Sequence, residues 1–203
     1  MKRSDIKELH YITHIDNLKS ICEHGILCHN RAKKMKFTSV ANGEIQERRK
    51  KVVIPGGKSK LHSYANLYFN ARNPMMFKRK VMHKELCVLQ IDCTILDEPN
   101  IIISDRNASS GYVLFSPSPS GLKNLDRALI FADDWTDDDP IEYWIRKSTI
   151  CAEVLVPDYV EPIFIKGLYV SCKDTFQKVK QLLRGSSLAE KIFMNPKLFF
   201  REG

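Results

Sequence analysis

The sequence predicts a single α+β domain spanning residues 1–203, and three observations support that class. The 203 residues are 43% hydrophobic, which is enough to bury one sizeable core. Strand-like and helical segments alternate irregularly, which disfavours a regular βαβ series. The chain also shows no internal repeat and no clear domain boundary.

Local signals place the secondary-structure elements. A helix is expected to begin at Asp16, a favoured N-cap residue, and to end at Gly25, a favoured residue just beyond a helix. Strands are expected where apolar and β-branched residues run together or alternate, at 8–12, 67–70, 86–92, 101–104, 151–156, 163–170 and 191–194. Helical periodicity recurs at 122–131, 139–147 and 173–183. A Ser- and Pro-rich loop is expected over 116–121.

Residues 31–60 form a long basic segment. Apart from a short helix expected over 43–51, the segment lacks apolar periodicity and ends in a turn at Pro55-Gly56-Gly57, which is typical of a functional loop. It holds ten Lys and Arg and two Glu, a net charge of 10 − 2 = +8, equal to that of the whole chain, 32 − 24 = +8. Such a concentration favours a phosphate-bearing partner, a nucleotide or a nucleic acid. The alternative is a solvated lysine-rich loop.

Several classes of protein are disfavoured. The chain has no apolar run long enough to span a membrane, and its first residues, MKRSDIKELH, lack the apolar core of a signal peptide, so a cytoplasmic protein is expected. Six scattered cysteines fit reduced thiols better than a disulfide framework. Cys22, His24, Cys28 and His29 include no CxxC pair, so no metal is expected. No phosphate-binding glycine loop, GxSxG or HExxH motif is present.

Glu153 is an ionisable residue in an unusual place. It interrupts the apolar run "ICAEVLVP", and strand alternation puts it on one face with Cys151 and Leu155. An isolated buried charge is costly, so the functional reading is a pocket carboxylate that faces developing charge in a reaction. The alternative is an edge position that faces solvent.

Three segments resemble the motif strands of ADP-ribosyltransferases in order and spacing. They are "LHYITHIDNLKSICEHGI", "LYFNARNPMMF" and "AEVLVPDYV". More narrowly, they resemble the DarT toxins, which attach ADP-ribose to bases of single-stranded DNA. The resemblance runs from about residue 7 to 170 and includes "IQERRKKVVIP". It implies a split β-sheet core with flanking helices and NAD bound in a cleft of that core, with residues 31–60 folded over the NAD.

The resemblance implies two catalytic residues. Glu153 matches the catalytic glutamate, which stabilises the positive charge that develops on the ribose as nicotinamide departs, as in glycoside cleavage. It would also help to remove a proton from the attacking base nitrogen. Arg49 is the preferred match to the catalytic arginine, with the adjacent Arg48 as the alternative, since a guanidinium suits the diphosphate or a polarised base. A helix surface is the alternative for Arg49, and more so for Lys50 and Lys51.

The resemblance also implies NAD contacts, at Thr13, His14, Asn17, Arg48, Tyr68, Arg72 and Met75. The Tyr68 ring would pack against nicotinamide, with Met75, Met76 and Phe77 as an apolar wall. The alternative for Met75, Met76 and Phe77 is an ordinary position in the hydrophobic core. Arg72 would reach a phosphate or support its loop, and His14 has a structural hydrogen-bonding role as its alternative. The family commonly shows a histidine where this chain has Tyr11, which leaves open whether the neighbouring His10 contacts NAD.

Residues 132–150 correspond to the part of such transferases that selects the acceptor. The expected DNA contacts are Tyr143, Trp144, Arg146 and Lys147, because aromatic rings amid cations suit an unpaired base and its phosphates. Helix core is the alternative for the two aromatic residues. The aspartates in 133–139 would repel DNA, so they are expected to face away or to cap the following helix.

The resemblance therefore implies transfer of ADP-ribose from NAD to a base in single-stranded DNA, with thymine favoured and guanine as the alternative. It also implies the role of a toxin and, as its partner, an antitoxin that contains a macrodomain. A monomer is expected. Two other functions stay open, an ADP-ribosyltransferase that acts on RNA or protein and an inactive nucleic-acid-binding module.

Overall fold

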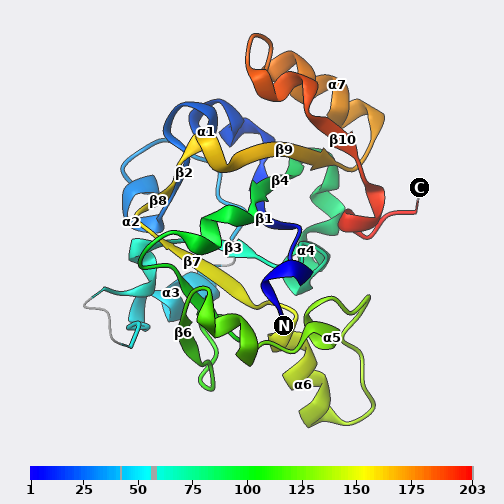
Figure 1. Cartoon of the computed structure of the whole chain (residues 1–203). Coiled ribbons are helices and arrows are strands. Elements are labelled where there is room, and N and C mark those ends of the chain that lie inside the picture. The colour runs from blue at the N-terminus through cyan, green and yellow to red at the C-terminus, as the bar shows by residue number, and fades with distance from the viewer. Residues whose placement is uncertain (42, 56–58, 203) are drawn as a thin grey trace.

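In a computed structural model, an eight-stranded sheet runs through the chain in the strand order β10-β9-β4-β1-β3-β7-β5-β6 (Figure 1). The structure describes residues 1–41, 43–55 and 59–202. The sheet comprises β1 (Glu8–His14), β3 (Tyr64–Tyr68), β4 (Leu86–Asp92), β5 (Ile102–Ser104), β6 (Phe115–Pro117), β7 (Glu153–Pro157), β9 (Ile165–Val170) and β10 (Ile192–Met194). All neighbours pair antiparallel except β10 and β9, which are parallel. A second small sheet pairs β2 (Ile26–Leu27) with β8 (Tyr159–Val160).

Short helices flank the sheet. The α-helices are α1 (Leu18–His24), α2 (His29–Ala32), α3 (Gly43–Lys51), α4 (Pro74–Arg79), α5 (Arg127–Ile130), α6 (Pro140–Thr149) and α7 (Lys173–Leu182). The 3-10 helices are η1 (Arg3–Asp5), η2 (Ile15–Asn17), η3 (Leu61–Ser63), η4 (Lys80–Glu85), η5 (Cys93–Asp97), η6 (Ser120–Asn124), η7 (Pro162–Phe164), η8 (Ser187–Glu190) and η9 (Pro196–Phe199). In Figure 1, α7 lies above the sheet and α5 and α6 lie below it.

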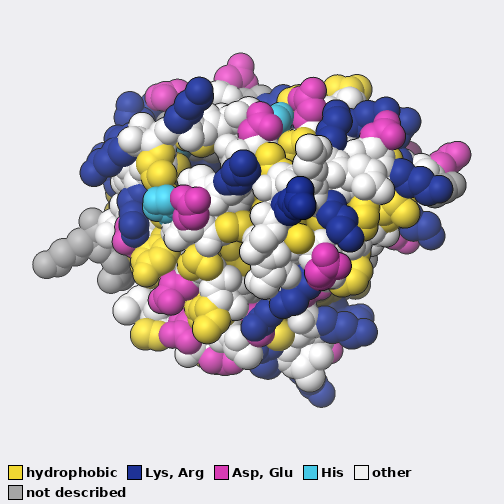
Figure 2. All heavy atoms as spheres, turned by 90° about the horizontal axis from the view of Figure 1, so that it is seen from above, with side chains coloured by type: hydrophobic (Ala, Val, Ile, Leu, Met, Phe, Trp, Pro, Cys, Tyr) yellow, Lys and Arg dark blue, Asp and Glu magenta, His cyan; other side chains and the backbone are white. Residues whose placement is uncertain are grey.

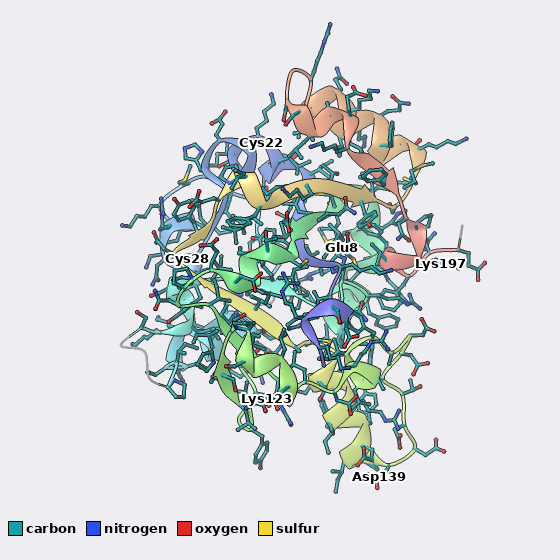
Figure 3. The ribbon with its side chains drawn as sticks, viewed as in Figure 1. Glu8, Cys22, Cys28, Lys123, Asp139 and Lys197 are labelled. Carbon is teal, nitrogen blue, oxygen red and sulfur yellow. The ribbon has the colours of Figure 1, made fainter. Side chains whose placement is uncertain are left out.

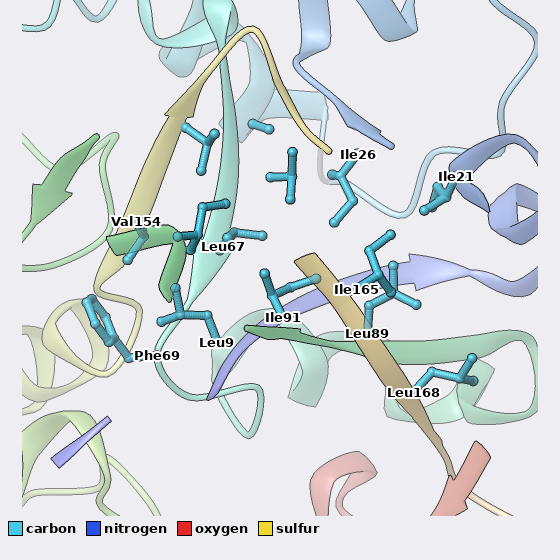
Figure 4. Packing of buried hydrophobic residues seen from close by; sticks show 14 of the residues in the cluster. Leu9, Ile21, Ile26, Leu67, Phe69, Leu89, Ile91, Val154, Ile165 and Leu168 are labelled. Atoms are coloured by element: carbon cyan, nitrogen blue, oxygen red, sulfur yellow. The ribbon is translucent and has the colours of Figure 1, made fainter. Parts of the chain in front are cut away.

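The main hydrophobic core lies on one face of the sheet. Leu9, Leu67, Leu89 and Val154 come from four strands, are fully buried and point to this face because side chains alternate along each strand (Figure 4). Burial of a leucine or valine side chain contributes about 1.5–3 kcal/mol. The core therefore fixes the register of the strands that carry the site on the opposite face.

The sheet is split between β1 and β3. β1 pairs with β4 along all seven of its residues, but it meets β3 in the single pair His10↔Tyr68. Beyond that pair the two strands diverge, and residues of both strands line a cleft. The predicted α+β class with a split sheet core is confirmed.

The predicted boundaries of the first helix need a correction. Asp16 lies in η2, and its backbone N–H donates to His14 Nδ1 at 3.2 Å, so the N-cap of α1 is Asn17. Gly25 ends α1 as predicted, with a positive φ of 77°.

At α6 the predicted cap is confirmed. The Asp139 carboxylate accepts the N–H groups of Ile141 at 2.7 Å and Glu142 at 3.2 Å. Asp139 lies at the lower edge of Figure 3.

Other predicted elements are shifted or divided. The helix expected over 122–131 is instead η6 followed by α5, because Asp126 caps a new helix by accepting the Leu129 N–H. The strand expected over 67–70 runs from Tyr64 to Tyr68. The later strands begin one or two residues after their predicted starts, at 153–157, 165–170 and 192–194. The elements β2, β6, β8, α2 and α4 were not predicted, because they are too short to show a period. Of the predicted turn at 55–57, Gly56 and Gly57 lie outside the described residues.

Charged side chains are interspersed on the face that carries α7. Figure 2 looks onto the top of the molecule in Figure 1 and shows Lys and Arg side chains scattered among Asp and Glu. The cations of this face are therefore not gathered into one patch. Within the described ranges, no helix is both long and apolar enough to cross a membrane.

Gly25 provides a test of the packing beside the small sheet. A Cβ at this position would clash with the backbone carbonyl oxygen of Val160, and φ is positive. We expect Gly25→Ala to lower the free energy of unfolding by about 2 kcal/mol or more, measured by urea denaturation. Gly43→Ala is the matched control, since a Cβ there meets open space, and it should change stability by less than about 0.5 kcal/mol. Equal effects of the two substitutions would contradict this account.

Candidate active site

A cleft of about 770 Å³ opens where β1 and β3 diverge. Its walls come from these two strands, from α3 and the segment 37–41 that precedes it, from α4, from the loop 106–112 and from α6. The cleft thus lies between the two halves of the split sheet. Elements far apart in the sequence meet there.

The centre of the site is a row of three residues on adjacent strands. Glu153, the first residue of β7, lies opposite Tyr68 of β3 and opposite Ser104 of β5. Directly opposed residues of antiparallel strands point to the same face of a sheet. The Ser104 hydroxyl oxygen accepts the N–H of Glu153 at 3.2 Å, which fixes the start of β7. Glu153 is fully buried, so the alternative of a solvent-facing edge position is wrong.

Arg49 and Glu153 form a buried bidentate ion pair. The two terminal guanidinium nitrogens of Arg49 donate to the two carboxylate oxygens of Glu153, each at 3.0 Å. The backbone N–H of Ala108 donates to Glu153 Oε1 at 2.9 Å. Burial lowers the pKa of Arg49, but the charge of Glu153 and its hydrogen bonds outweigh burial, so the pKa lies above its ordinary value. Arg49 therefore stays protonated where it is buried against Glu153.

The guanidinium of Arg49 lies between the carboxylate and the cleft. Arg49 lines the cleft, whereas Glu153 is not among the described residues that line it. Of the nine described residues of α3, only Arg49 is buried. Arg48 is exposed and lines the rim of the cleft, so of the two adjacent arginines it is Arg49 that pairs with Glu153.

Tyr68 and Met75 form one wall beside this pair. Both line the cleft, and the Tyr68 hydroxyl donates to Met75 Sδ at 3.5 Å. Burial and then the nearby negative charge of Glu153 raise the pKa of Tyr68 well above its ordinary value, so the phenol stays protonated. Met76 is fully buried in the core and Phe77 packs against Trp135 outside the cleft. The predicted apolar wall is therefore reduced to Met75.

Asn17 connects the first strand to the basic segment. Its side-chain amide donates to Thr13 Oγ1 at 3.1 Å and to the Thr38 carbonyl at 2.8 Å, and its oxygen accepts the Thr38 N–H at 2.9 Å. From the other side, Arg79 donates to the carbonyls of Val40 at 2.9 Å and Ala41 at 3.0 Å. Segment 37–41 is thereby anchored over the cleft at both ends. Thr13 and Asn17 both line the cleft.

Three other residues considered for NAD binding are not among the described residues that line the cleft: His14, Arg72 and His10. His14 caps η2 and contacts Glu85 at 3.6 Å, an arrangement that favours its structural alternative. Arg72 donates to the carbonyl of Lys197, a residue marked in Figure 3, and stacks on the Phe200 ring at 4.0 Å, which favours support of the loop over a phosphate contact. The His10 ring nitrogens lie 3.3 Å from the Phe69 carbonyl oxygen and 3.0 Å from Glu8 Oε1.

α6 presents one face to the cleft. Residues of this face are Ile141, Trp144, Ile145, Lys147 and Ser148. Trp144 is 63% exposed, and the Lys147 ammonium lies 4.6 Å from the centre of its ring. Tyr143 accepts a hydrogen bond from Lys147 at 2.8 Å and packs in a small cluster with Trp135. Arg146 forms an ion pair with Asp137 at 3.0 Å. Of the four predicted DNA contacts, the structure places Trp144 and Lys147 at the cleft.

Two parts of the site were missed by sequence reasoning. The loop 106–112 supplies the Ala108 N–H and several cleft residues, but a backbone donor leaves no signal in the side-chain sequence. His29 and His62 also line the cleft, with ring centres 4.1 Å apart. They lie 33 residues apart in sequence, so no local pattern pairs them.

Comparisons with known proteins agree with this geometry. The family described as "ssDNA thymidine ADP-ribosyltransferase, DarT" matches residues 10–200. A DNA ADP-ribosyl transferase of Thermus sp. (strain 2.9) is 44% identical over 192 residues, with 87% of each chain covered. A "DNA ADP-ribosyl transferase-DNA ADP-ribosyl glycohydrolase fusion protein" of Thermosipho africanus (strain H17ap60334) is 32% identical over 203 residues, which is 96% of this chain and 50% of the fusion protein. The chain therefore spans about half the length of that relative.

A solved structure supports the fold. The structure "Thermosipho africanus DarTG in complex with ADP-ribose" superposes with a TM-score of 0.82 at 29% identity, over 96% of this chain and 51% of that one. The split sheet and its flanking helices are therefore common to both.

His62 makes stability depend on pH. It is 8% exposed, its Nε2 has no hydrogen-bond partner among the described residues, and burial followed by the charges of His29 and Arg49 lowers its pKa from 6.5 to about 4. As pH falls, the His62 imidazole therefore binds its proton at a higher pH in the unfolded chain than in the folded chain. Stability should fall as pH drops from about 6.5 to about 4, by on the order of 1–3 kcal/mol.

The measurement is urea denaturation at about pH 7 and about pH 5. His62→Gln should lose less stability between the two values than wild type does. The exposed His24 supplies the control, and His24→Gln should behave like wild type. An unchanged pH dependence in His62→Gln would contradict the assignment.

Proposed function

The chain belongs to the DarT family of ssDNA thymidine ADP-ribosyltransferases, and from that premise we propose that it transfers ADP-ribose from NAD+ to thymidine in single-stranded DNA. The observation that carries the proposal is the buried Arg49–Glu153 pair beneath a cleft in a split sheet. The family description names thymidine; guanine, the alternative base from the sequence, has no support in it.

The residues of the cleft fit NAD+ as co-substrate. The volume of about 770 Å³ lies within the range of small-molecule sites. Tyr68 and Met75 offer an apolar wall for the nicotinamide ring. Arg48 and Lys78 offer cations for the diphosphate. Thr13 and Asn17 add polar groups to the same cleft.

NAD+ supplies a ribose carbon bonded to a cationic nicotinamide, which leaves as a neutral molecule with the electron pair of the broken bond. Glu153 is proposed to hold a ribose hydroxyl and to face the positive charge that develops on the sugar. The thymine ring nitrogen that carries a proton forms the new bond, and the proton passes to the carboxylate. Tyr68 keeps the leaving ring in place and, as a neutral phenol, adds no charge.

This role requires that Arg49 move. In the structure both carboxylate oxygens accept hydrogen bonds from Arg49, and the guanidinium covers them. Among its described residues α3 fully buries only the Arg49 side chain, and we propose that a displacement of this helix exposes the carboxylate. Arg49 would then be free to bind the diphosphate or the polarised base.

The acceptor must be unpaired, because a base in a duplex cannot enter such a cleft. We propose that Trp144 stacks on the DNA and that Lys147 meets a phosphate. Tyr143 and Arg146 would act indirectly, by supporting α6 and the segment that precedes it.

The proposed partner is an enzyme that removes the mark. One relative is a fusion of a transferase with a DNA ADP-ribosyl glycohydrolase, and the family resemblance assigns such an antitoxin to a macrodomain. We propose that this chain acts as the toxin of such a pair. Its monomeric state and cytoplasmic location stay predictions.

The first test incubates the protein with labelled NAD+ and a panel of single-stranded DNA, duplex DNA, RNA and protein. Label is expected on thymidine-containing single-stranded DNA. Glu153→Gln should reduce that label by about a thousandfold or more, because the sugar cation loses its counter-charge. Glu161→Gln, on the surface, is the control and should retain activity. Label on RNA or protein alone would contradict the proposal, as would full activity of a folded Glu153→Gln variant.

A second test separates the two adjacent arginines. Arg49→Lys replaces a bidentate donor by a single ammonium, and it should lower kcat by about a hundredfold. Arg48→Lys keeps a charge on the cleft rim and should lower kcat by less than about fivefold. Steady-state kinetics with a thymidine oligonucleotide measures both. The reverse order of effects would move the catalytic role to Arg48.

A further inference from the structure

The loop between β5 and β6, residues 105–114, is held in one conformation by its own hydrogen bonds. At its base, the Asp105 N–H donates to the Leu114 carbonyl at 3.1 Å, and the Leu114 N–H donates to the Asp105 carboxylate at 2.8 Å. Within it, the Asn107 side chain accepts from the Ser109 N–H at 2.9 Å and from its hydroxyl at 2.7 Å. The loop is therefore pre-organised and not a loose connection.

This loop is also fixed to the site. The Asn107 N–H donates to the Ser148 carbonyl of α6 at 2.9 Å, and the next residue donates its N–H to Glu153. Ser148 lies four residues after Trp144, one turn further along the same helix face. The loop and the exposed ring of Trp144 thus border the cleft together.

Tyr112 stands at the outer part of this loop. It lines the cleft and is 85% exposed, so an aromatic ring is held in water on a rigid support. Trp144, at 63% exposure, lines the same cleft. A cation lies over one of these rings, since the Lys147 ammonium sits over Trp144, and Arg106 of the loop lines the same cleft.

We propose that Tyr112 is a DNA-binding residue, which together with Trp144 stacks on unpaired bases of the strand at the mouth of the cleft. This inference rests on the proposed function and adds a residue and an interaction to it. A rigid ring on a pre-organised loop loses little conformational entropy on binding. Stacking accepts every base, so it would hold the strand on either side of the thymidine without restricting its sequence.

The experiment measures the affinity of a fluorescent single-stranded oligonucleotide that contains one thymidine, by anisotropy and without NAD+. Tyr112→Ala should raise Kd about tenfold, as expected for the loss of one stacked base, and Tyr112→Phe should stay within about twofold of wild type. The slope of log Kd against log salt should not change, because no phosphate contact is lost.

Leu114→Ala is the matched control. Leu114 lies on the same loop and is 62% exposed, but it is not among the described residues that line the cleft. It should leave Kd unchanged. A Tyr112→Ala variant whose Kd equals that of Leu114→Ala would overturn the proposal, and so would a changed salt slope.

An abasic oligonucleotide sharpens the test. If the bases that flank the thymidine are removed, both proteins should bind more weakly and the tenfold difference between wild type and Tyr112→Ala should disappear, since the base that stacks on Tyr112 is then absent. A tenfold difference that persists on the abasic oligonucleotide would overturn the proposal. These binding results stand whether or not wild type labels DNA, so failure of the proposed function and failure of this inference are separately visible.

Discussion

The buried pair of Arg49 and Glu153 is the interaction on which the site depends. A carboxylate in a fully buried strand is tolerated only with full hydrogen-bonding and charge compensation, and here three N–H donors from two elements provide it. The pair links β7, which lies between β3 and β5 in the sheet, to a helix that otherwise lies on the surface. It thereby joins the sheet to the part of the cleft wall that α3 forms.

The split between β1 and β3 creates the space above that pair. The two strands share one register pair, and their divergence exposes polar backbone and side chains that a continuous sheet would cover. Asn17 and Arg79 then satisfy carbonyl groups of the segment laid across the opening. The geometry of the cleft is thus a consequence of the incomplete pairing between β1 and β3.

The sequence was informative where a residue type conflicts with its surroundings. Glu153 was predicted as a site residue because its charge interrupts an apolar strand. The split sheet core was predicted from the family resemblance. The sequence could not decide which of Arg48 and Arg49 faces Glu153, because either side of a short polar helix could pack inward. For His14 the structure favours the hydrogen-bonding alternative, because a histidine at a strand end serves equally well as a helix cap. Ala108 acts through its backbone, so no side chain could have revealed it.

The sparse burial of α3 has a kinetic consequence. A helix that docks through one deeply buried side chain opens and closes as a local unit, with a free-energy cost far below that of global unfolding. If the proposed transfer requires this opening, the opening frequency would set a ceiling on turnover, however fast the bond-breaking step is. Between openings the fully buried carboxylate of Glu153 would stay shielded from water.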